Sequence, residues 1–239
     1  MAQLIQDIKP RGTDSAYVSA PFDVAKAELE ANDYKVISLE ENARLRMQEG
    51  KDSYVSRNGN WTREGVLYLP DKRILLTKNS PIMDNPKEAT DCHRQGKEFY
   101  LTPEQVEKAL AESIEIKDRQ IPTNRFGENE LTVYAFGEVA KQYGEFLKEA
   151  GIEEMPVWLA NVQDKPFARQ MWFRDLVGRS ELNGNDRGLS YCRVRGVRVS
   201  GAEGTQKSFE SYSPIQIANA LKKANLSGIE QLLFSNLRK

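Results

Sequence analysis

The residues of this chain best suited to proton or metal chemistry are Asp91, Cys92 and His93, which are consecutive. His93 is the one histidine, and the other cysteine, Cys192, lies far away in the sequence. A zinc site needs more nitrogen or sulfur ligands than this group supplies. A Cys–His nucleophilic pair needs side chains that meet, whereas those of adjacent residues mostly point apart. We therefore expect Cys92 and His93 to be structural, with no metal site and no disulfide.

The motifs of other common catalytic sites are missing from the sequence as well. No Gly-x-Ser-x-Gly elbow occurs, and His93 would be the one imidazole available to a serine. No glycine-rich phosphate loop follows a predicted strand. The many carboxylates fit the solvated faces of helices. The sequence thus predicts no catalytic residue, no cofactor and no enzymatic activity.

The composition is that of a globular protein: 239 residues, 39% of them hydrophobic, with a net charge of -1. This charge gives no electrostatic case for nucleic acid or for an anionic membrane as a partner. No apolar run is long enough to cross a bilayer, so we expect no membrane insertion. The N-terminus lacks the basic start and apolar stretch of a signal peptide. The expected location is the cytoplasm by default, with a virion or cell surface as the alternative.

Capping residues and glycines predict the helices. Helix starts are indicated by two capping boxes, Ser38 with Glu41 and Thr102 with Gln105. Apolar residues at helical spacing follow each start, and Gly50 ends the first helix. The predicted helices cover residues 21–31, 39–49, 102–116 and 134–150.

Turn residues between apolar runs predict the strands. Asn58-Gly59 predicts a hairpin that joins 53–57 to 61–63, and Pro70-Asp71 predicts a second hairpin. The polar segment 79–91 is expected to be a loop. The further predicted strands are 66–69, 73–77, the buried strands 156–160 and 167–173, and a final strand over 191–199.

The segment from Met171 to Val199 has a pattern of its own. Isolated apolar residues are separated by small and polar ones, and glycines with Asn/Asp pairs break any helical repeat. A long irregular segment in a compact domain is commonly functional or disordered, and the apolar residues argue against disorder. An ordinary surface loop is the alternative to a functional one. We expect a loop held to the core at a few points that leads into a strand. We call the apolar points anchor residues: Trp172, Leu176, Leu182, Leu189, Tyr191 and Val194.

This pattern, over about 166–198, resembles the variable region of diversity-generating retroelement target proteins, most closely the archaeal type. The residues that carry the resemblance are Trp172-Phe173, Leu176, Arg179-Ser180, Leu182, Gly184, Arg187, Leu189, Tyr191 and Arg193–Val197. The resemblance implies an α+β, C-type lectin-type fold of the formylglycine-generating-enzyme-like branch. We expect a twisted antiparallel sheet flanked by the helices 102–116 and 134–150.

The resemblance also implies which positions vary. In that family, mutagenic reverse transcription replaces bases opposite adenine, so that Asn codons of the AAY type become NNY codons. Glu181 cannot arise in this way and is expected to be constant. The implied ligand-binding, variable residues are Arg174, Asp175, Val177, Gly178, Arg179, Asn183, Asn185, Asp186, Gly188, Ser190, Cys192 and Arg193.

The implied function is the display of a variable surface that recognises a protein or a cell-surface ligand. The alternatives are an enzyme of the formylglycine-generating type, which depends on cysteine chemistry, and a structural viral attachment subunit. The variable region of the family commonly lies near the C-terminus, whereas here more sequence follows it. We expect a ligand-binding domain over 1–199, a linker over 200–212, and a helical tail over 213–239. Apolar faces on the tail helices suggest docking on the domain or homo-oligomerisation.

Overall fold

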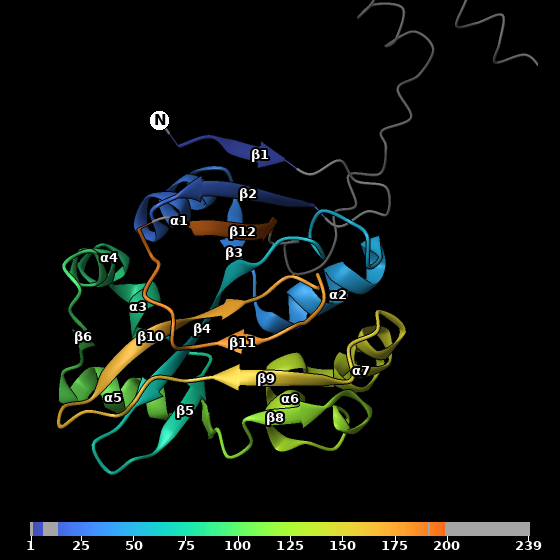
Figure 1. Ribbon diagram of the computed structural model, residues 1–239. Coiled ribbons are helices and arrows are strands. Elements are labelled where there is room, and N and C mark those ends of the chain that lie inside the picture. The colour runs from blue at the N-terminus through green and yellow to red at the C-terminus, as the bar shows by residue number, and fades with distance from the viewer. Residues whose placement is uncertain (1, 7–13, 191, 199–239) are drawn as a thin grey trace, which may run out of the picture. The chain divides into compact units, whose positions relative to one another are not determined.

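A mixed sheet forms the centre of the molecule. The computed structural model describes residues 2–6, 14–190 and 192–198. The main path through the sheet runs β1-β2-β12-β4-β10-β11-β9-β8, and the other strands pair beside it (Figure 1). Most neighbours are antiparallel, but β12 is parallel to β4 and β11 is parallel to β9. The strands are β1 (Leu4–Gln6), β2 (Ser15–Ala20), β3 (Tyr34–Val36), β4 (Asn60–Tyr68), β5 (Ile74–Thr77), β6 (Phe99–Tyr100), β7 (Ser113–Glu115), β8 (Gln120–Pro122), β9 (Glu154–Trp158), β10 (Phe167–Phe173), β11 (Leu182–Asn183) and β12 (Cys192–Arg198).

Strand β4 separates two hydrophobic cores, because successive side chains of a strand point to opposite faces. Val66 and Tyr68 belong to the core that includes the helices α2 (Leu39–Glu49), α6 (Glu130–Phe136) and α7 (Ala140–Glu149). Trp61 and Leu67 belong to the core that includes the helices α1 (Phe22–Ala31), α4 (Pro86–Arg94) and α5 (Pro103–Leu110). A further helix is α3 (Pro81–Asp84), and short 3-10 turns lie at Thr123–Arg125 and Gly137–Val139.

The two helix starts predicted from capping boxes are confirmed. Ser38 accepts a hydrogen bond from the Glu41 amide, and the Glu41 carboxylate accepts one from the Ser38 amide. Thr102 and Gln105 form the same reciprocal pair at the start of α5. These boxes satisfy amide groups that have no partner within the helix, which is why the polar residues fix both starts.

Two of the helices differ from those predicted. The helix over 102–116 ends at Leu110, and Ile114 lies in β7, where it pairs with Leu76 of β5. The region predicted as the helix over 134–150 contains α6, which begins earlier, at Glu130, and α7, which ends at Glu149, with a 3-10 turn between them. Gly137 ends α6 with a φ of 57°, a conformation that glycine adopts without strain. At the end of α5, by contrast, the pairing of β7 with β5 outweighs local helical propensity.

The hairpin predicted at Asn58-Gly59 is wrong, although the one at Pro70-Asp71 is confirmed by β4 and β5. The segment before Asn58 folds as turns. The Arg57 amide donates to the Ser53 carbonyl at 3.0 Å, and the Ser53 and Ser56 hydroxyls both bond the Gly50 carbonyl. Strand β4 then runs without a break through Gly65. Serine hydroxyls offer the backbone an alternative to strand pairing.

Two other predictions also need correction. The segment 79–91 is not a loop, because α3 and α4 form within it, each with proline at its first turn. Proline is favoured there since that amide has no helical partner. The strand predicted over 156–160 is β9, which ends at Trp158, and half of the Trp158 side chain is exposed. The predicted strand over 167–173 is confirmed.

Residues Met1–Val199 form one compact unit. The predicted linker over 200–212, the helical tail over 213–239 and its suggested role in homo-oligomers lie outside the described residues. Within the part of the chain that the structure describes, every helix is too short or too polar to cross a bilayer.

Candidate functional site

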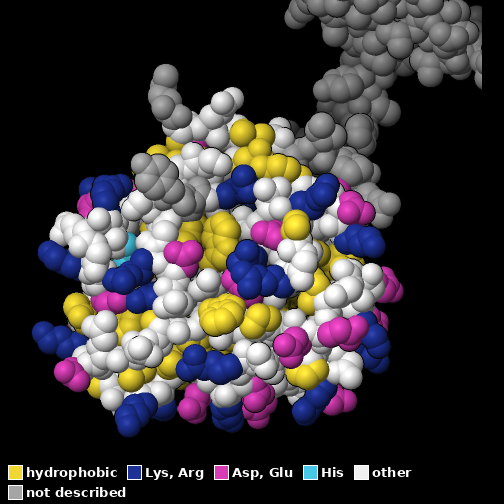
Figure 2. Space-filling model, viewed as in Figure 1, with side chains coloured by type: hydrophobic (Ala, Val, Ile, Leu, Met, Phe, Trp, Pro, Cys, Tyr) yellow, Lys and Arg dark blue, Asp and Glu magenta, His cyan; other side chains and the backbone are white. Residues whose placement is uncertain are grey.

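The loop that joins β10 to β12 crosses the face shown in Figure 1, and β11 lies in its middle. Apolar side chains reach this face among scattered basic and acidic ones (Figure 2). Beneath the surface, Leu176, Leu182, Leu189 and Val194 are buried. Leu182 belongs to the core under α2 and α7, whereas Leu189 belongs to the core under α1. The loop is therefore held to both cores of the domain.

Main-chain hydrogen bonds hold the loop at the same points. The Leu176 amide donates to the Ser56 carbonyl at 2.7 Å, and the Phe22 amide donates to the Leu189 carbonyl at 2.8 Å. The anchor Trp172 is half-buried rather than buried, and its ring meets Trp61 edge-on with centroids 5.2 Å apart. Tyr191 lies outside the described residues. The buried leucines thus provide the anchoring that the sequence predicts, and Trp172 does so only in part.

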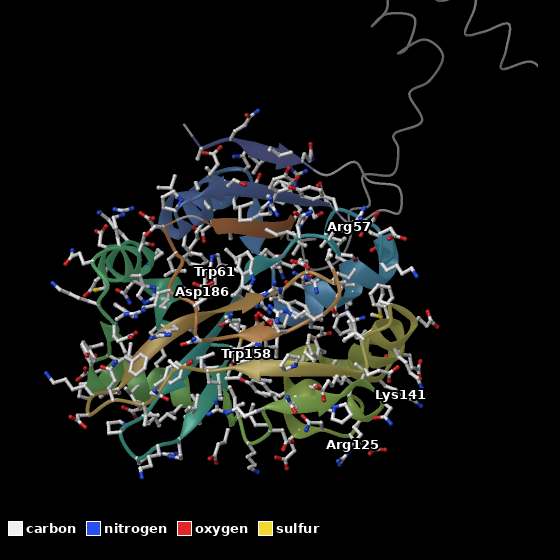
Figure 3. All side chains as sticks on the ribbon, in the orientation of Figure 1. Arg57, Trp61, Arg125, Lys141, Trp158 and Asp186 are labelled. Atoms are coloured by element: carbon white, nitrogen blue, oxygen red, sulfur yellow. The ribbon has the colours of Figure 1, made fainter. Side chains whose placement is uncertain are left out.

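A buried carboxylate, Glu181, organises the first half of the loop. Its side chain is 3% exposed and receives Arg174 Nη1 at 3.2 Å and Trp158 Nε1 at 3.0 Å. Arg179 Nε lies 3.5 Å from the same carboxylate. Figure 3 shows Trp158 over the middle of this face. A buried carboxylate requires such partners because it has lost its hydration, so Glu181 ties the loop to β9.

Below this point a buried arginine, Arg46, fixes the backbone where the loop leaves β10. Arg46 Nη2 donates to the Arg174 carbonyl at 2.7 Å, and Nη1 donates to the Tyr143 hydroxyl at 3.2 Å. Its guanidinium carbon lies 4.0 Å from the centre of the Phe173 ring. Burial raises the pKa of Tyr143. These contacts involve only the main chain of Arg174, so they do not depend on its side chain.

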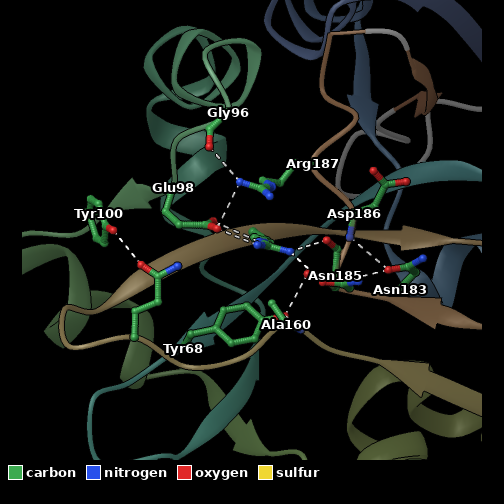
Figure 4. Close-up of polar contacts among 12 residues, drawn as sticks. Tyr68, Gly96, Glu98, Tyr100, Ala160, Asn183, Asn185, Asp186 and Arg187 are labelled. Atoms are coloured by element: carbon green, nitrogen blue, oxygen red, sulfur yellow. Dashed lines mark hydrogen bonds and ion pairs between the residues drawn. The ribbon is translucent and has the colours of Figure 1, made fainter.

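A second buried ion pair, Glu98 with Arg169, holds the middle of the loop (Figure 4). The Arg169 guanidinium bonds both Glu98 oxygens, at 3.1 and 2.6 Å. It also donates to the main-chain carbonyl and side-chain oxygen of Asn185. Arg187 donates to the Gly96 carbonyl at 2.9 Å and lies 3.5 Å from Glu98. The pair is a rigid support for the segment around Asn185.

Side chains of Asp and Asn close the tight turns of the loop. Asp175 accepts the Val177 amide at 2.9 Å, and Asp186 accepts the Gly188 amide at 2.7 Å. Asn183 accepts the amides of the second and third residues after it. Short polar side chains favour such turns because they replace a backbone acceptor.

The Tyr68 hydroxyl supports the loop from below. It donates to the Gly184 carbonyl at 2.8 Å and accepts the Ala160 amide at 3.3 Å. Burial raises the pKa of Tyr68 to about 12, so the hydroxyl keeps its proton at neutral pH. Gly184 itself allows a close approach, since a β-carbon there would lie 2.7 Å from Val66.

The predicted ligand-binding residues lie along this loop and the start of β12. Their burial is graded. Val177, Gly178, Arg179, Asn185 and Asp186 are exposed. Intermediate burial is found for Arg174, Asp175, Asn183, Gly188, Ser190 and Arg193. Cys192 begins β12 opposite Ala20 of β2.

Arg193 lies at one end of the set, in an aromatic environment. Its guanidinium carbon is 5.5 Å from the Tyr17 ring centre and 5.3 Å from that of Tyr54, and these rings stack at 5.0 Å. Arg193 Nη1 also donates to Asn58 at 2.7 Å. Ser190 and Arg193 line an open hollow of about 1060 Å³ together with Trp172 and His93. The sequence does not point to Tyr54, because the Asn58-Gly59 turn signal predicts a strand over the segment that contains it.

His93 and Cys92, the candidates for chemistry, lie on α4. Burial lowers the pKa of His93 to about 4, so the ring is neutral at neutral pH. Burial, reinforced by Glu88, raises the pKa of the Cys92 thiol. Within the described residues no group of His, Cys, Asp and Glu is arranged to hold a metal ion.

Comparison with known proteins identifies the fold. No protein-family model and no curated protein match the chain. A solved structure from Nanoarchaeota, described as accommodating massive sequence variation by the C-type lectin fold, is similar with a TM-score of 0.62. The likeness covers 80% of this chain and 100% of that one, at 18% sequence identity. The chain therefore has a C-type lectin fold, with mixed helices and sheet as the sequence predicts.

Proposed function

We propose that this chain is the target protein of a diversity-generating retroelement and displays a variable ligand-binding surface. The observation that carries the proposal is the division of roles within one loop. Leu182 and Leu189 are fully buried in separate cores, whereas Val177, Asn185 and Asp186 between or beside them are exposed. Exposed substitutions rarely change stability by more than about 0.5 kcal/mol. Such a loop can therefore accept different side chains while its path is kept.

The nanoarchaeal structure supports the proposal, because that protein combines this fold with massive sequence variation. Among the described residues of the loop, Arg, Asn, Asp and Gly occupy all the exposed positions except Val177. Adaptable polar side chains on a rigid frame are typical of antibody-like binding surfaces. We propose a protein or cell-surface ligand, with no nucleic acid, no membrane insertion and no cofactor.

The proposal assigns no catalysis to this chain. An enzyme of the formylglycine-generating type would use a reactive cysteine, and a reactive cysteine has a lowered pKa. The pKa of Cys92 is shifted in the opposite direction. Cys192 lies at a position that we propose to be variable, which does not suit a catalytic residue. A role as a viral attachment subunit would be one form of the proposed binding function.

Sequencing of the gene's neighbourhood tests the proposal. We expect a reverse transcriptase gene and a template repeat that matches the codons for about residues 166–198. The template should carry AAY codons at the proposed variable positions, and a different codon at Glu181. Copies of the gene from a population should differ at those positions only. A locus without a template, or copies that differ evenly along the chain, would contradict the proposal.

A further inference from the structure

Trp158 lies next to the proposed variable positions but outside the segment that contains them. It is the last residue of β9, and in the parallel pairing of β9 with β11 its register partner is Asn183. Half of its side chain, 50%, is exposed, whereas Trp61 is 1% exposed. Figure 3 places it on the open face over β9 and β11. A single exposed hydrophobic side chain is normal on a protein surface, so it is the position of Trp158 beside the proposed variable residues that makes it a candidate contact residue.

The orientation of Trp158 is fixed by polar contacts at its inner side. The indole Nε1 donates to Glu181 Oε2 at 3.0 Å, and that carboxylate is 3% exposed. The Trp158 carbonyl accepts the Gly184 amide at 2.8 Å. The ring is therefore held in place before any ligand arrives. A preoriented aromatic side chain loses little conformational entropy on binding.

Side chains at the proposed variable positions converge on the same carboxylate. Arg174 and Arg179 lie 3.2 and 3.5 Å from Glu181, whose own codon cannot arise from the template. If these arginines are replaced in other variants, the indole N–H remains as a constant donor to the buried carboxylate. Trp158 and Glu181 thus form a fixed pair surrounded by positions that change.

We infer that Trp158 is a constant contact residue of the binding surface, which presents its ring to an apolar patch on protein ligands while the neighbouring side chains set specificity. This inference rests on the proposed function. Trp and Arg are the residue types most enriched among those that dominate protein–protein binding. In this chain the guanidinium groups of Arg174 and Arg179 both face the single carboxylate of Glu181, which leaves an excess of positive charge beside Trp158. A ligand whose apolar patch is bordered by a carboxylate would therefore fit this chain best.

Binding measurements on selected variants test the inference without a known natural ligand. The full chain would be displayed on yeast with NNY codons at the proposed variable positions. The library would be selected separately for binding to ubiquitin, lysozyme and serum albumin. For each binder, Kd would be compared among the parent and its Trp158→Ala and Trp158→Phe variants. Val133→Ala provides a control, because Val133 is 43% exposed and belongs to helix α6, outside the loop and β9.

We expect Trp158→Ala to raise Kd roughly tenfold or more in most binders, as for a dominant contact residue, with Trp158→Phe raising it much less. Val133→Ala should leave Kd unchanged. Both tryptophan variants lose the indole N–H group. If Trp158 only holds Glu181 in place, the Ala and Phe variants should therefore raise Kd equally and should lower the melting temperature equally. Equal effects, or no effect of Trp158→Ala, would overturn the inference while the proposed function stands. A folded library that yields no binder would overturn both.

Discussion

The turn Asp175–Gly178 and the segment Ser180–Asn185 belong to one loop but are held in different ways. In the turn, Val177 is 63% exposed, and no atom lies within 4 Å of a β-carbon placed on Gly178. In the segment, Ser180, Glu181, Leu182 and Gly184 are all buried. The turn is closed by the Asp175 side chain, and its one buried residue, Leu176, donates its amide to the Ser56 carbonyl, whereas the segment is held by side chains from other strands.

This difference shows how a single loop can combine a fixed path with replaceable side chains. The supports of the loop bond mainly to its main chain. Arg46 bonds the Arg174 carbonyl, Tyr68 bonds the Gly184 carbonyl, and Arg169 bonds the Asn185 carbonyl. A main-chain carbonyl is present whatever the side chain is. We therefore expect the exposed residues of the turn to tolerate substitution well. In the segment, tolerance should depend on whether the supporting group contacts the main chain or the side chain of the residue that is replaced.

The largest effect is expected from the ion pair below the segment. Glu98→Gln leaves the buried Arg169 guanidinium without a carboxylate, and breaking a buried pair costs roughly 3–5 kcal/mol. Urea unfolding measures the change in the free energy of unfolding. Asp84→Asn is the matched control, because the Lys108–Asp84 pair is exposed; its cost should be at most about 1 kcal/mol. Equal costs for the two variants would show that the segment does not depend on the buried pair.

Truncation of an anchor should come next. Leu182→Ala removes a fully buried side chain from the core under α2, and such cavities cost roughly 2–5 kcal/mol. Leu189→Ala should fall in the same range in the other core. Val177→Ala, in the exposed turn, should change the free energy of unfolding by about 0.5 kcal/mol or less. Thermal melts of the three variants measure the difference. Similar melting temperatures for all three would refute the distinction between anchor residues and exposed residues of the loop.

Much of this frame could be predicted from the sequence, because its signals are local. The capping boxes at Ser38 and Thr102 fix two helix starts. The spacing of Leu182 and Leu189 marks anchors. The division at Gly137 follows from its φ of 57°, which ends α6 and which glycine adopts without strain. The early end of the helix predicted over 102–116 could not be predicted in this way, since its cause is the pairing of β7 with β5. The same limit applies to the site.

In the site, the resemblance implies that Glu181 is constant but does not indicate the contacts of this residue. In the structure the Glu181 carboxylate is buried and bonded by Arg174 and Trp158, of which Trp158 lies far from it in the sequence. Trp158 was assigned to a buried strand because its neighbours in sequence are apolar. Only the pairing of β9 at the surface shows that its ring is exposed. Such contacts between distant segments are decided by tertiary packing rather than by local pattern.

Two glycines provide a finer test of the comparison. Gly184→Ala in the segment should cost about 1–3 kcal/mol, because the new methyl group meets Val66. Gly178→Ala in the turn should cost about 1 kcal/mol, because its φ of 78° disfavours side chains although the space is open. Asn tolerates that conformation, so Gly178→Asn should be nearly neutral, whereas Gly184→Asn should be worse than Gly184→Ala. The reverse order in urea unfolding would contradict the assigned causes.

Arg174 tests whether a proposed variable position can still contribute to the frame. Arg174→Ser removes one partner of the buried Glu181 while Trp158 remains, and the side chain of Arg174 is 36% exposed. We expect a loss of about 1 kcal/mol in the free energy of unfolding. Arg179→Ser should cost less, because Arg179 is 53% exposed and lies farther from the carboxylate. If Arg179→Ser lowers the free energy of unfolding more than Arg174→Ser does, then Arg179 rather than Arg174 is the stronger partner of Glu181.

The smallest effect per residue is expected at the exposed positions, which can be changed together. Val177, Arg179 and Asn185 are exposed, and each can be replaced by Ser or Tyr, which NNY codons also encode. Asn185 is the informative member, because Arg169 bonds its main-chain carbonyl as well as its side chain. After replacement the carbonyl bond remains, so each change should cost about 0.5 kcal/mol or less. The costs should also be nearly additive if the sites are independent. Urea unfolding of the triple Ser and triple Tyr variants measures this, with Leu182→Ala as the destabilised reference. If the triple variants unfold as easily as Leu182→Ala, the exposed side chains themselves hold the loop, and the surface cannot be one that tolerates variation.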